Sequence, residues 1–276
     1  MKKSIKITIL ALVLVLILAP VLAYGLLYAI TPARYNILIA GSDQRGEERA
    51  RSDVLMVFSL PKNPQGKTSL ITIPRDSRVD IPGHGLDKIT HAYVYGEREG
   101  EDNVILGNID LTKDTVEKFL NIKIHGTMEF NFESFKEIID MVGGVWTEEG
   151  FYDGDKALAQ VRNRYRAGGD FARTEDQREI VKAVMSKLKN KDKAIEVYNY
   201  LKESEKADIK INKTKALVFG GVTFIRRFGK LSLGDIQTEF IPGEGGYEYS
   251  DKFGQNLYFW IVDEQGKEAL VEEYLR

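Results

Sequence analysis

The sequence predicts one α/β domain of about 240 residues that follows a single transmembrane helix. Short apolar runs typical of strands alternate with segments of helical period throughout residues 31–276. Neither an internal repeat nor a low-complexity linker divides this region. A run without charge at residues 7–30 precedes it and supplies the predicted helix.

The N-terminal run is long enough to cross a bilayer, because a transmembrane helix needs roughly 20 apolar residues. Lys2, Lys3 and Lys6 precede it, so residues 1–6 are expected in the cytoplasm and residues 31–276 outside. A cleaved signal peptide is the alternative, since residues 21–23 (VLA) resemble a cleavage site. The run continues to Ile30, which favours a retained anchor, and both interpretations require export.

Composition excludes several classes of function. The formal net charge of −2 gives no positive excess for nucleic-acid binding by bulk charge, so any anion must be bound by local clusters. Cysteine is absent, which excludes disulfides, thiolate metal sites and a cysteine nucleophile.

Three strands are expected at the start of the domain. They are Tyr35–Ala40, Val54–Leu60 and Thr68–Ile73. The last two are joined by a Pro- and Gly-containing turn at residues 61–66. Further strands are predicted over 122–130, 236–241 and 257–262.

Helices account for most of the remaining periodic segments. They are predicted over 111–120, 132–142, 155–165, 173–188 and 191–202, with a last one from Asp263. Asn131 is a plausible N-cap for the second, and Gly143-Gly144 would end it. The fourth places five apolar residues on one face: Ile180, Val181, Val184, Met185 and Leu188.

Two carboxylates lie at the ends of strands expected to be neighbours. Asp43 follows the first strand within GSDQR, and Asp53 closes the triplet Arg51-Ser52-Asp53 before the second. A divalent cation relieves the repulsion between such carboxylates, and oxygen-only ligands suit Mg²⁺ or Mn²⁺. The alternative is that each aspartate is a cap or a solvated surface charge.

Arg75 ends the apolar segment ITIPR and is followed by Arg78. An arginine at the end of a strand can lie partly inside a cleft, where its planar guanidinium matches two phosphate oxygens. The alternative is an ion pair with Asp76 or Asp80. Lys88 in the next loop adds a further point charge for an anion.

A third polar segment begins with alternating cations at Arg162, Arg164 and Arg166. Arg173 and Gln177 follow, four residues apart on one helix face. Arg173 near the helix start opposes the macrodipole, and a bound anion would remove that conflict. The alternative is a solvated charged face that includes the neighbouring carboxylates.

These segments together resemble the LytR-CpsA-Psr family of cell-wall glycopolymer ligases. The resemblance rests on NILIAGSDQR, RSD, SLITIPRDSRVDIPG, DKITHAYVYG, FNFESFKEIIDMVGGV, ALAQVRNR, DFARTEDQ and, more weakly, FIPGEGGYEY and LYFWIVDE. It covers nearly all of residues 36–263.

The resemblance implies an α-β-α fold in which a central mixed sheet is flanked by helices and a polyprenyl chain is buried between them. It also implies transfer of a glycan phosphate from an undecaprenyl pyrophosphate carrier to peptidoglycan, at the outer face of the bacterial cytoplasmic membrane. The lipid monophosphate is released, and a metal, usually Mg²⁺, assists.

Residue roles follow from the same resemblance. Asp43 and Asp53 would hold the metal and, with Arg75, form the catalytic group. Arg51, Arg75, Arg162 and Arg164 would grip the pyrophosphate. The surrounding residues would be Arg78, Lys88, Asp170, Arg173 and Gln177. The base that activates the acceptor hydroxyl remains open among Asp43, Asp53 and the substrate itself.

The last motif departs from the family pattern, which often ends in Arg-Gln where this chain has Asp176-Gln177. A carboxylate there would weaken the local positive field unless it faces away or Arg178 compensates.

Two other functions are compatible with the same residues. One is a pyrophosphatase that uses water as acceptor, and the other is a non-catalytic lipid-binding protein.

Overall fold

The computed structural model describes residues 2–42, 52–96, 98–99, 105–163, 169–204, 207–226 and 235–276. The side chains of residues 2–11, 13, 98–99, 105–106 and 169–173 are not part of that description. Asp43, Arg51 and Arg164 therefore lie outside the described residues, as do the side chains of Asp170 and Arg173.

A six-stranded mixed sheet forms the centre of the domain, in the order β11-β8-β1-β2-β3-β12. The first three strands along the chain are β1 (Arg34–Ser42), β2 (Ser52–Pro61) and β3 (Thr68–Thr72). They pair in antiparallel fashion, whereas β8 (Gly126–Phe130) and β12 (Ile236–Phe240) pair in parallel with β1 and β3. The antiparallel edge strand β11 (Ala207–Ile211) pairs with β8.

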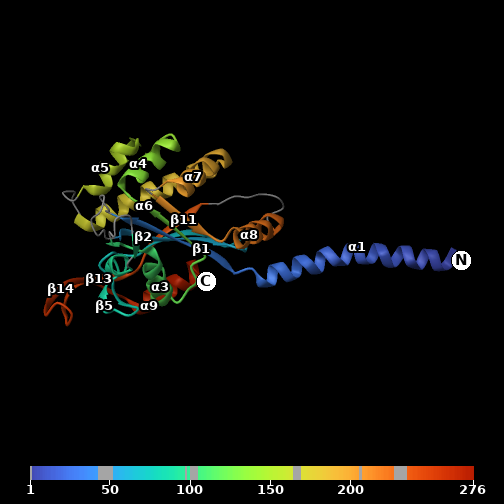
Figure 1. Ribbon diagram of the computed structural model, residues 1–276, viewed down its shortest axis with the longest axis horizontal. Helices are drawn as coiled ribbons and strands as arrows, with labels where there is room; N and C mark the ends of the chain where they lie inside the picture. Colours follow the sequence, from blue (N-terminus) through green and yellow to red (C-terminus); the bar gives the residue numbers. More distant parts are fainter. Residues whose placement is uncertain are drawn as a thin grey trace.

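Helices cover both faces of this sheet, which confirms the predicted α/β architecture (Figure 1). One face packs on α2 (His91–Tyr95), α3 (Ile109–Leu120) and α9 (Glu264–Tyr274), with Leu38, Leu55 and Ile71 in the shared core. The other face is covered by α4 (Phe132–Met141), α5 (Gly154–Arg162), α6 (Gly169–Lys187), α7 (Lys191–Glu203) and α8 (Lys213–Arg226).

The layer between the sheet and α6 contains Met56 and Met185, which are buried, and Met128, which is partly buried. These are three of the five methionines of the chain. Methionine side chains adapt readily to irregular space, so this layer is more deformable than one made of β-branched residues. All five apolar residues predicted for one face of α6 belong to the clusters on this side of the sheet.

Four small hairpins complete the chain. They are β4 (Arg78–Ile81) with β5 (Gly85–Lys88), β6 (Arg98–Glu99) with β7 (Ile105–Leu106), β9 (Val145–Thr147) with β10 (Gly150–Tyr152), and β13 (Gly243–Ser250) with β14 (Gln255–Val262). The last of these lies at the end of the molecule opposite to α1 (Lys2–Ile30), which extends away from the domain (Figure 1).

Two sequence expectations need correction. The strand predicted over 122–130 begins only at Gly126, because the amide of Ile124 bonds the Glu117 carboxylate and that of His125 bonds Asn36 outside the ladder. The helix predicted from Arg173 begins at Gly169, and α5 ends at Arg162. The sequence analysis did not predict β11, α8, β13 or the short hairpins.

Within the part of the chain that the structure describes, no helix meets the length and apolarity needed to cross a membrane. The anchor at residues 7–30 stays a prediction from the sequence.

The predicted N-cap at Asn131 is confirmed and extends to a full capping box. The Asn131 side chain accepts bonds from the amides of Glu133 and Ser134, and the Ser134 hydroxyl accepts from the Asn131 amide. Gly143 and Gly144 have φ values of 78° and 72°, which end the helix in the left-handed region that glycine adopts without strain.

We expect Asn131→Ala to lower the free energy of unfolding by about 1 kcal/mol, because two helix-start amides lose their acceptor. Asn131→Asp keeps that acceptor and serves as the matched control. Urea unfolding followed by circular dichroism measures both variants. Equal midpoints for Asn131→Ala and the parent protein would show that the cap contributes nothing.

Candidate functional site

Arg75 lies in the loop that follows β3, and three hydrogen bonds in and around this loop tie it to other segments. Pro74 has no amide hydrogen and stops the ladder, so the chain turns away from the sheet. The Arg75 carbonyl accepts from the Thr90 amide at 3.1 Å, and the Asp76 carbonyl accepts from the Trp260 amide at 2.9 Å. The Thr90 hydroxyl also bonds the Ser52 carbonyl at 2.9 Å, which ties this loop to the start of β2.

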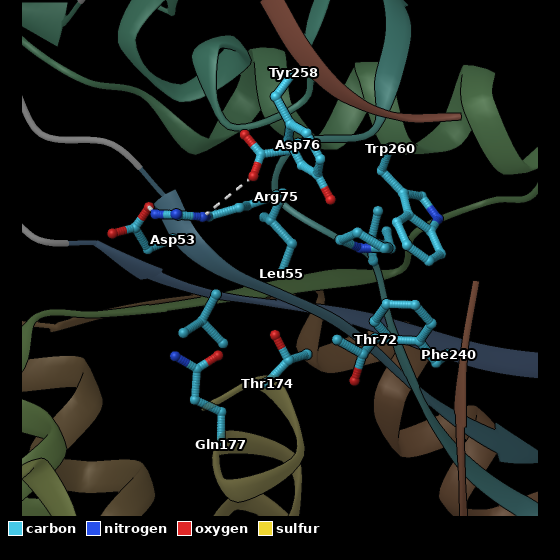
Figure 2. A pocket seen from close by; sticks show the side chains of 13 residues that line it. Asp53, Leu55, Thr72, Arg75, Asp76, Thr174, Gln177, Phe240, Tyr258 and Trp260 are labelled. Carbon is cyan, nitrogen blue, oxygen red and sulfur yellow. Dashed lines mark hydrogen bonds and ion pairs between the residues drawn. The ribbon is translucent and has the colours of Figure 1, made fainter. Parts of the chain in front are cut away.

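The side chains at this point form a chain of alternating charge. Arg75 Nη1 donates to Asp53 Oδ1 at 2.9 Å, and Arg75 Nε lies 3.6 Å from Asp76 Oδ2. Asp76 Oδ1 in turn accepts from Lys88 Nζ at 2.6 Å. Figure 2 shows Arg75 between the two carboxylates. All four side chains are between 17% and 25% exposed, so water only partly screens their charges.

Two clefts meet at this cluster, and Asp53, Arg75 and Asp76 line both. The first, which we name the main cleft, contains about 520 Å³ of space, part of it open to solvent. Its other lining residues are Val54, Leu55, Thr72, Ile73, Pro74, Thr174, Gln177, Phe240, Tyr258 and Trp260. The main cleft thus combines apolar and polar side chains, with the arginine on one side and α6 opposite (Figure 2).

The second cleft is wider, with about 1070 Å³ of space that is also open to solvent. Its remaining lining residues are Lys88, Thr90, His91, Val94, Tyr95, Phe253, Gln255 and Leu257. The Thr72 hydroxyl in the main cleft is buried and has no hydrogen-bond partner within the described part of the chain. A buried donor of this kind is costly unless a ligand or water satisfies it.

Gln177 of α6 faces the main cleft, whereas its neighbour Asp176 does not. Gln177 lines the cleft together with Thr174, and its amide nitrogen also reaches the Val161 carbonyl at 3.4 Å. Asp176 is buried on the other side of the helix, where it accepts a hydrogen bond from Gln160 at 3.0 Å. Asp176, which stands where the family pattern often has arginine, therefore leaves the electrostatic potential around Arg75 largely unchanged.

Two arginines that the resemblance assigns to the pyrophosphate line neither cleft. Arg78 forms an ion pair with Glu248, and its guanidinium carbon lies 5.6 Å from the Phe259 ring centroid. Arg162 is exposed at the end of α5, with its guanidinium carbon 5.0 Å from the centroid of Phe132. Their roles in pyrophosphate binding stay predictions, whereas Asp53, Arg75, Lys88 and Gln177 are gathered around the clefts.

The other predicted metal ligand, Asp43, lies outside the described residues, which end β1 at Ser42. Ser42, the last residue of β1, pairs with Ser52 of β2 across a register shift.

Asp53 also fits a divalent cation. Its Oδ1 accepts from Arg75, while no described residue bonds Oδ2. Among the described side chains, no three His, Cys, Asp or Glu groups gather as a metal site. Mg²⁺ does not require such a group, since it keeps several waters and binds one or two carboxylates. Asp53 thus has an oxygen suited to a cation, and its role as a ligand together with Asp43 stays a prediction.

Asp87 is not among the site residues predicted from the sequence. It bonds His91 and Tyr95, which line one wall of the second cleft. Asp87 is 1% exposed and accepts hydrogen bonds from His91 Nδ1 at 2.9 Å, the Tyr95 hydroxyl at 2.6 Å and the Lys88 amide at 2.8 Å. Burial raises the pKa of Asp87, but these hydrogen bonds outweigh it and hold the pKa well below its ordinary value. His91 and Tyr95 follow Asp87 by four and eight residues. This spacing is common in sequences and does not by itself indicate a buried aspartate.

Comparison with known proteins gives one family. The profile of the LytR_cpsA_psr family matches residues 30–151 and 149–274. A curated relative from Bacillus anthracis, the polyisoprenyl-teichoic acid–peptidoglycan teichoic acid transferase TagU, is 33% identical over 256 residues. That alignment covers 86% of this chain and 77% of the relative.

Solved structures give the same fold. Bacillus subtilis TagV is 26% identical, with a TM-score of 0.63 over 88% of this chain and 98% of TagV. A structure of TagT bound to LI-WTA is also 26% identical, with a TM-score of 0.63 over 87% of this chain and 89% of TagT.

We expect Asp87→Asn to lower the free energy of unfolding by about 2 kcal/mol at pH 7, because hydrogen bonds to a charged acceptor are lost. A depressed folded-state pKa stabilises the fold fully above the unfolded pKa of about 3.9, and the gain is lost as the pH falls through the folded value. The difference between variant and parent should therefore shrink at pH 3.

Urea unfolding at both pH values measures this difference. Asp80→Asn is the matched control, because Asp80 is 52% exposed and, among the described residues, pairs with Lys118 alone. A difference for Asp87→Asn that persists unchanged at pH 3 would refute the electrostatic origin.

Proposed function

The chain belongs to the LytR_cpsA_psr family, and on that premise we propose that it is a glycopolymer transferase. Its substrate is a glycan carried on a polyprenyl pyrophosphate such as the undecaprenyl carrier, and its acceptor is peptidoglycan. The names of its relatives support both partners, since TagU is a polyisoprenyl-teichoic acid–peptidoglycan transferase.

The observation that carries this proposal is a partly buried guanidinium at the mouth of a cleft that also has apolar walls. Arg75 is 25% exposed, and Leu55, Ile73 and Phe240 line the same space. Such a cleft suits a ligand whose anionic group is joined to an apolar chain. The methionine-containing layer between the sheet and α6 lies on the same side and can adapt to the chain.

The reaction transfers one phosphoryl group and needs no covalent enzyme intermediate. The acceptor hydroxyl oxygen bonds to the phosphorus that carries the glycan, and the bond from that phosphorus to the bridging oxygen breaks. The electron pair leaves with the lipid monophosphate, and the hydroxyl proton passes to Asp53, Asp43 or a phosphate oxygen. Phosphoryl transfer of this kind depends mainly on position and on neutralised oxygens.

The side chains around Arg75 supply these requirements. The Arg75 guanidinium is fixed by its loop and presents paired N–H donors to phosphate oxygens. Lys88 adds positive charge from the second cleft, and Gln177 and the Thr72 hydroxyl face the main cleft as neutral donors. Removal of water from the cleft strengthens each of these interactions.

A divalent cation, Mg²⁺ or Mn²⁺, is part of the proposal, with Asp53 and Asp43 as its protein ligands. When bound, the cation would neutralise charge on the phosphate oxygens. The anchor predicted at residues 7–30 would hold the domain at the outer face of the cytoplasmic membrane, where a membrane-bound carrier is within reach.

We expect Arg75→Lys to reduce the transfer rate by roughly 10²- to 10³-fold, since lysine cannot offer two parallel donors to the pyrophosphate. Arg178→Lys is the matched control, because Arg178 is similarly exposed, pairs with Glu175 on α6 and lines neither the main nor the second cleft. The assay follows purified full-length protein, Mg²⁺, a polyprenyl-pyrophosphate glycan and a peptidoglycan acceptor by mass spectrometry.

The products also separate the competing functions. Glycan phosphate on the acceptor supports the transferase, free glycan phosphate alone indicates a pyrophosphatase, and no turnover indicates a binding protein. Full turnover in both Arg75→Ala and Asp53→Ala would falsify the site assignment.

We also expect a chelator to stop turnover and added Mg²⁺ to restore it. Asp53→Asn should raise the half-saturating Mg²⁺ concentration by at least about tenfold, because one anionic ligand becomes neutral. Asp80→Asn again serves as the control. Calorimetric titration of Mg²⁺ into protein without substrate gives an independent measurement, and equal Mg²⁺ affinity in Asp53→Asn and parent would exclude Asp53 as a ligand.

A further inference from the structure

One face of the β13–β14 hairpin carries a strip of aromatic rings that continues out of the main cleft. The register pairs Gly245 with Trp260, Tyr247 with Tyr258 and Tyr249 with Asn256, and directly paired residues share a face. Trp260 and Tyr258 line the main cleft beside Arg75, on the side opposite to α6 (Figure 2). The strip therefore begins at the site and runs outward along the hairpin.

Trp260 at the inner end of this strip is buried, whereas the three tyrosines farther out are exposed. Trp260 is 6% exposed, Tyr258 38%, Tyr249 56% and Tyr247 76%. Tyr247 and Tyr258 meet edge to face, with ring centroids 5.8 Å apart. Large exposed aromatic side chains grouped in this way are uncommon on a free surface and typically mark a binding face. We name the four residues Tyr247, Tyr249, Asn256 and Tyr258 the tyrosine platform.

The way the hairpin is attached to the domain leaves the tyrosine platform uncovered. Its other face is attached to the domain, where Phe259 is buried and Glu248 pairs with Arg78 of β4. A Cβ on Gly245 would lie 2.3 Å from the Tyr258 hydroxyl oxygen and 2.9 Å from two ring carbons. Glycine at this position therefore gives the Tyr258 ring room against β13.

The chemistry of the platform suits a neutral sugar chain. Aromatic rings pack against the C–H faces of pyranose rings, while tyrosine hydroxyls and the Asn256 amide offer hydrogen bonds to sugar hydroxyl and acetamido groups. The hydroxyls of Tyr247 and Tyr249 make no hydrogen bond to any described residue, so both are available. The register places no cation on this face of β13, and Glu244 and Glu248 alternate onto the other face, so nothing on the platform pairs with the charges of a polyanionic chain.

Position on the molecule excludes the membrane as occupant. The hairpin lies at the end opposite to α1, which carries the predicted anchor (Figure 1). Exposed tyrosines also occur at membrane interfaces, but such residues would need to lie near α1.

We propose that the tyrosine platform binds the acceptor, a neutral N-acetylhexosamine glycan strand, and delivers one of its hydroxyls to the phosphorus beside Arg75. This inference rests on the proposed transfer reaction and adds the acceptor subsite to it. The teichoic-acid type of donor glycan is a polyanion, so an aromatic face without cations favours the acceptor over the donor.

The test uses full-length protein and a β-1,4-linked N-acetylglucosamine hexamer as probe. We expect Tyr247→Ala/Tyr249→Ala to weaken hexamer binding roughly tenfold by calorimetry, since two stacking rings are lost. Trp146→Ala is the matched control, because Trp146 is 69% exposed on the β9–β10 hairpin and lines neither the main nor the second cleft. Thermal unfolding of each variant establishes that the fold is kept.

Kinetics distinguish the two glycans. The platform variant should raise KM for the peptidoglycan acceptor by a similar factor, with KM for the lipid-linked donor and kcat at saturating acceptor unchanged. A raised donor KM with unchanged acceptor KM would assign the surface to the donor glycan instead and overturn the proposal. Unchanged hexamer binding in a folded variant overturns it as well.

Failure of the proposed function is recognisable separately. If the parent protein does not turn over a lipid-linked glycan, hexamer binding and its loss in the platform variant still decide the subsite. Arg75→Ala, in contrast, should abolish transfer while hexamer binding stays within a factor of two of the parent.

Discussion

The ion pair between Arg75 and Asp53 is the interaction on which the rest of the site depends. A guanidinium that is only 25% exposed beside a partly apolar cleft is costly without a nearby carboxylate, and Asp53 supplies one at 2.9 Å. Both partners stand at the same edge of the sheet because β2 and β3 are antiparallel neighbours. On the proposed function, a pyrophosphate would satisfy the guanidinium and a cation would satisfy Asp53, so neither charge is left unpaired when substrate binds.

The central architecture was predictable wherever local pattern and tertiary burial agree. The strands β1 to β3 are apolar runs bounded by polar turns, and Asn131 and Gly143 mark the two ends of α4 with their own chemistry. Prediction failed where the partner is distant. Ile122 and Ile124 have the apolar alternation of a strand and are buried like one, yet the Ile124 amide donates to the Glu117 carboxylate and the His125 amide donates to the Asn36 carbonyl.

The site was predictable only in part for the same reason. Asp53 and Arg75 stand at strand ends, which sequence alone indicates, and the structure brings both to the main cleft. Tyr258 and Trp260 reach that cleft from more than 180 residues along the chain, and no local pattern connects them with Arg75. The burial of Asp176 against Gln160 depends on how α5 packs against α6, which the identity of the residue does not reveal.

Trp260 joins the two halves of the proposed mechanism. Its amide bonds the Asp76 carbonyl at 2.9 Å, its indole N–H bonds the Ile241 carbonyl at 3.2 Å, and its ring lines the main cleft. The hairpin that carries the tyrosine platform is therefore bonded directly to the loop that carries Arg75. Because phosphoryl transfer without a covalent nucleophile depends on holding acceptor and phosphorus in line, a rigid link between the acceptor surface and the phosphate-binding arginine is what the reaction requires.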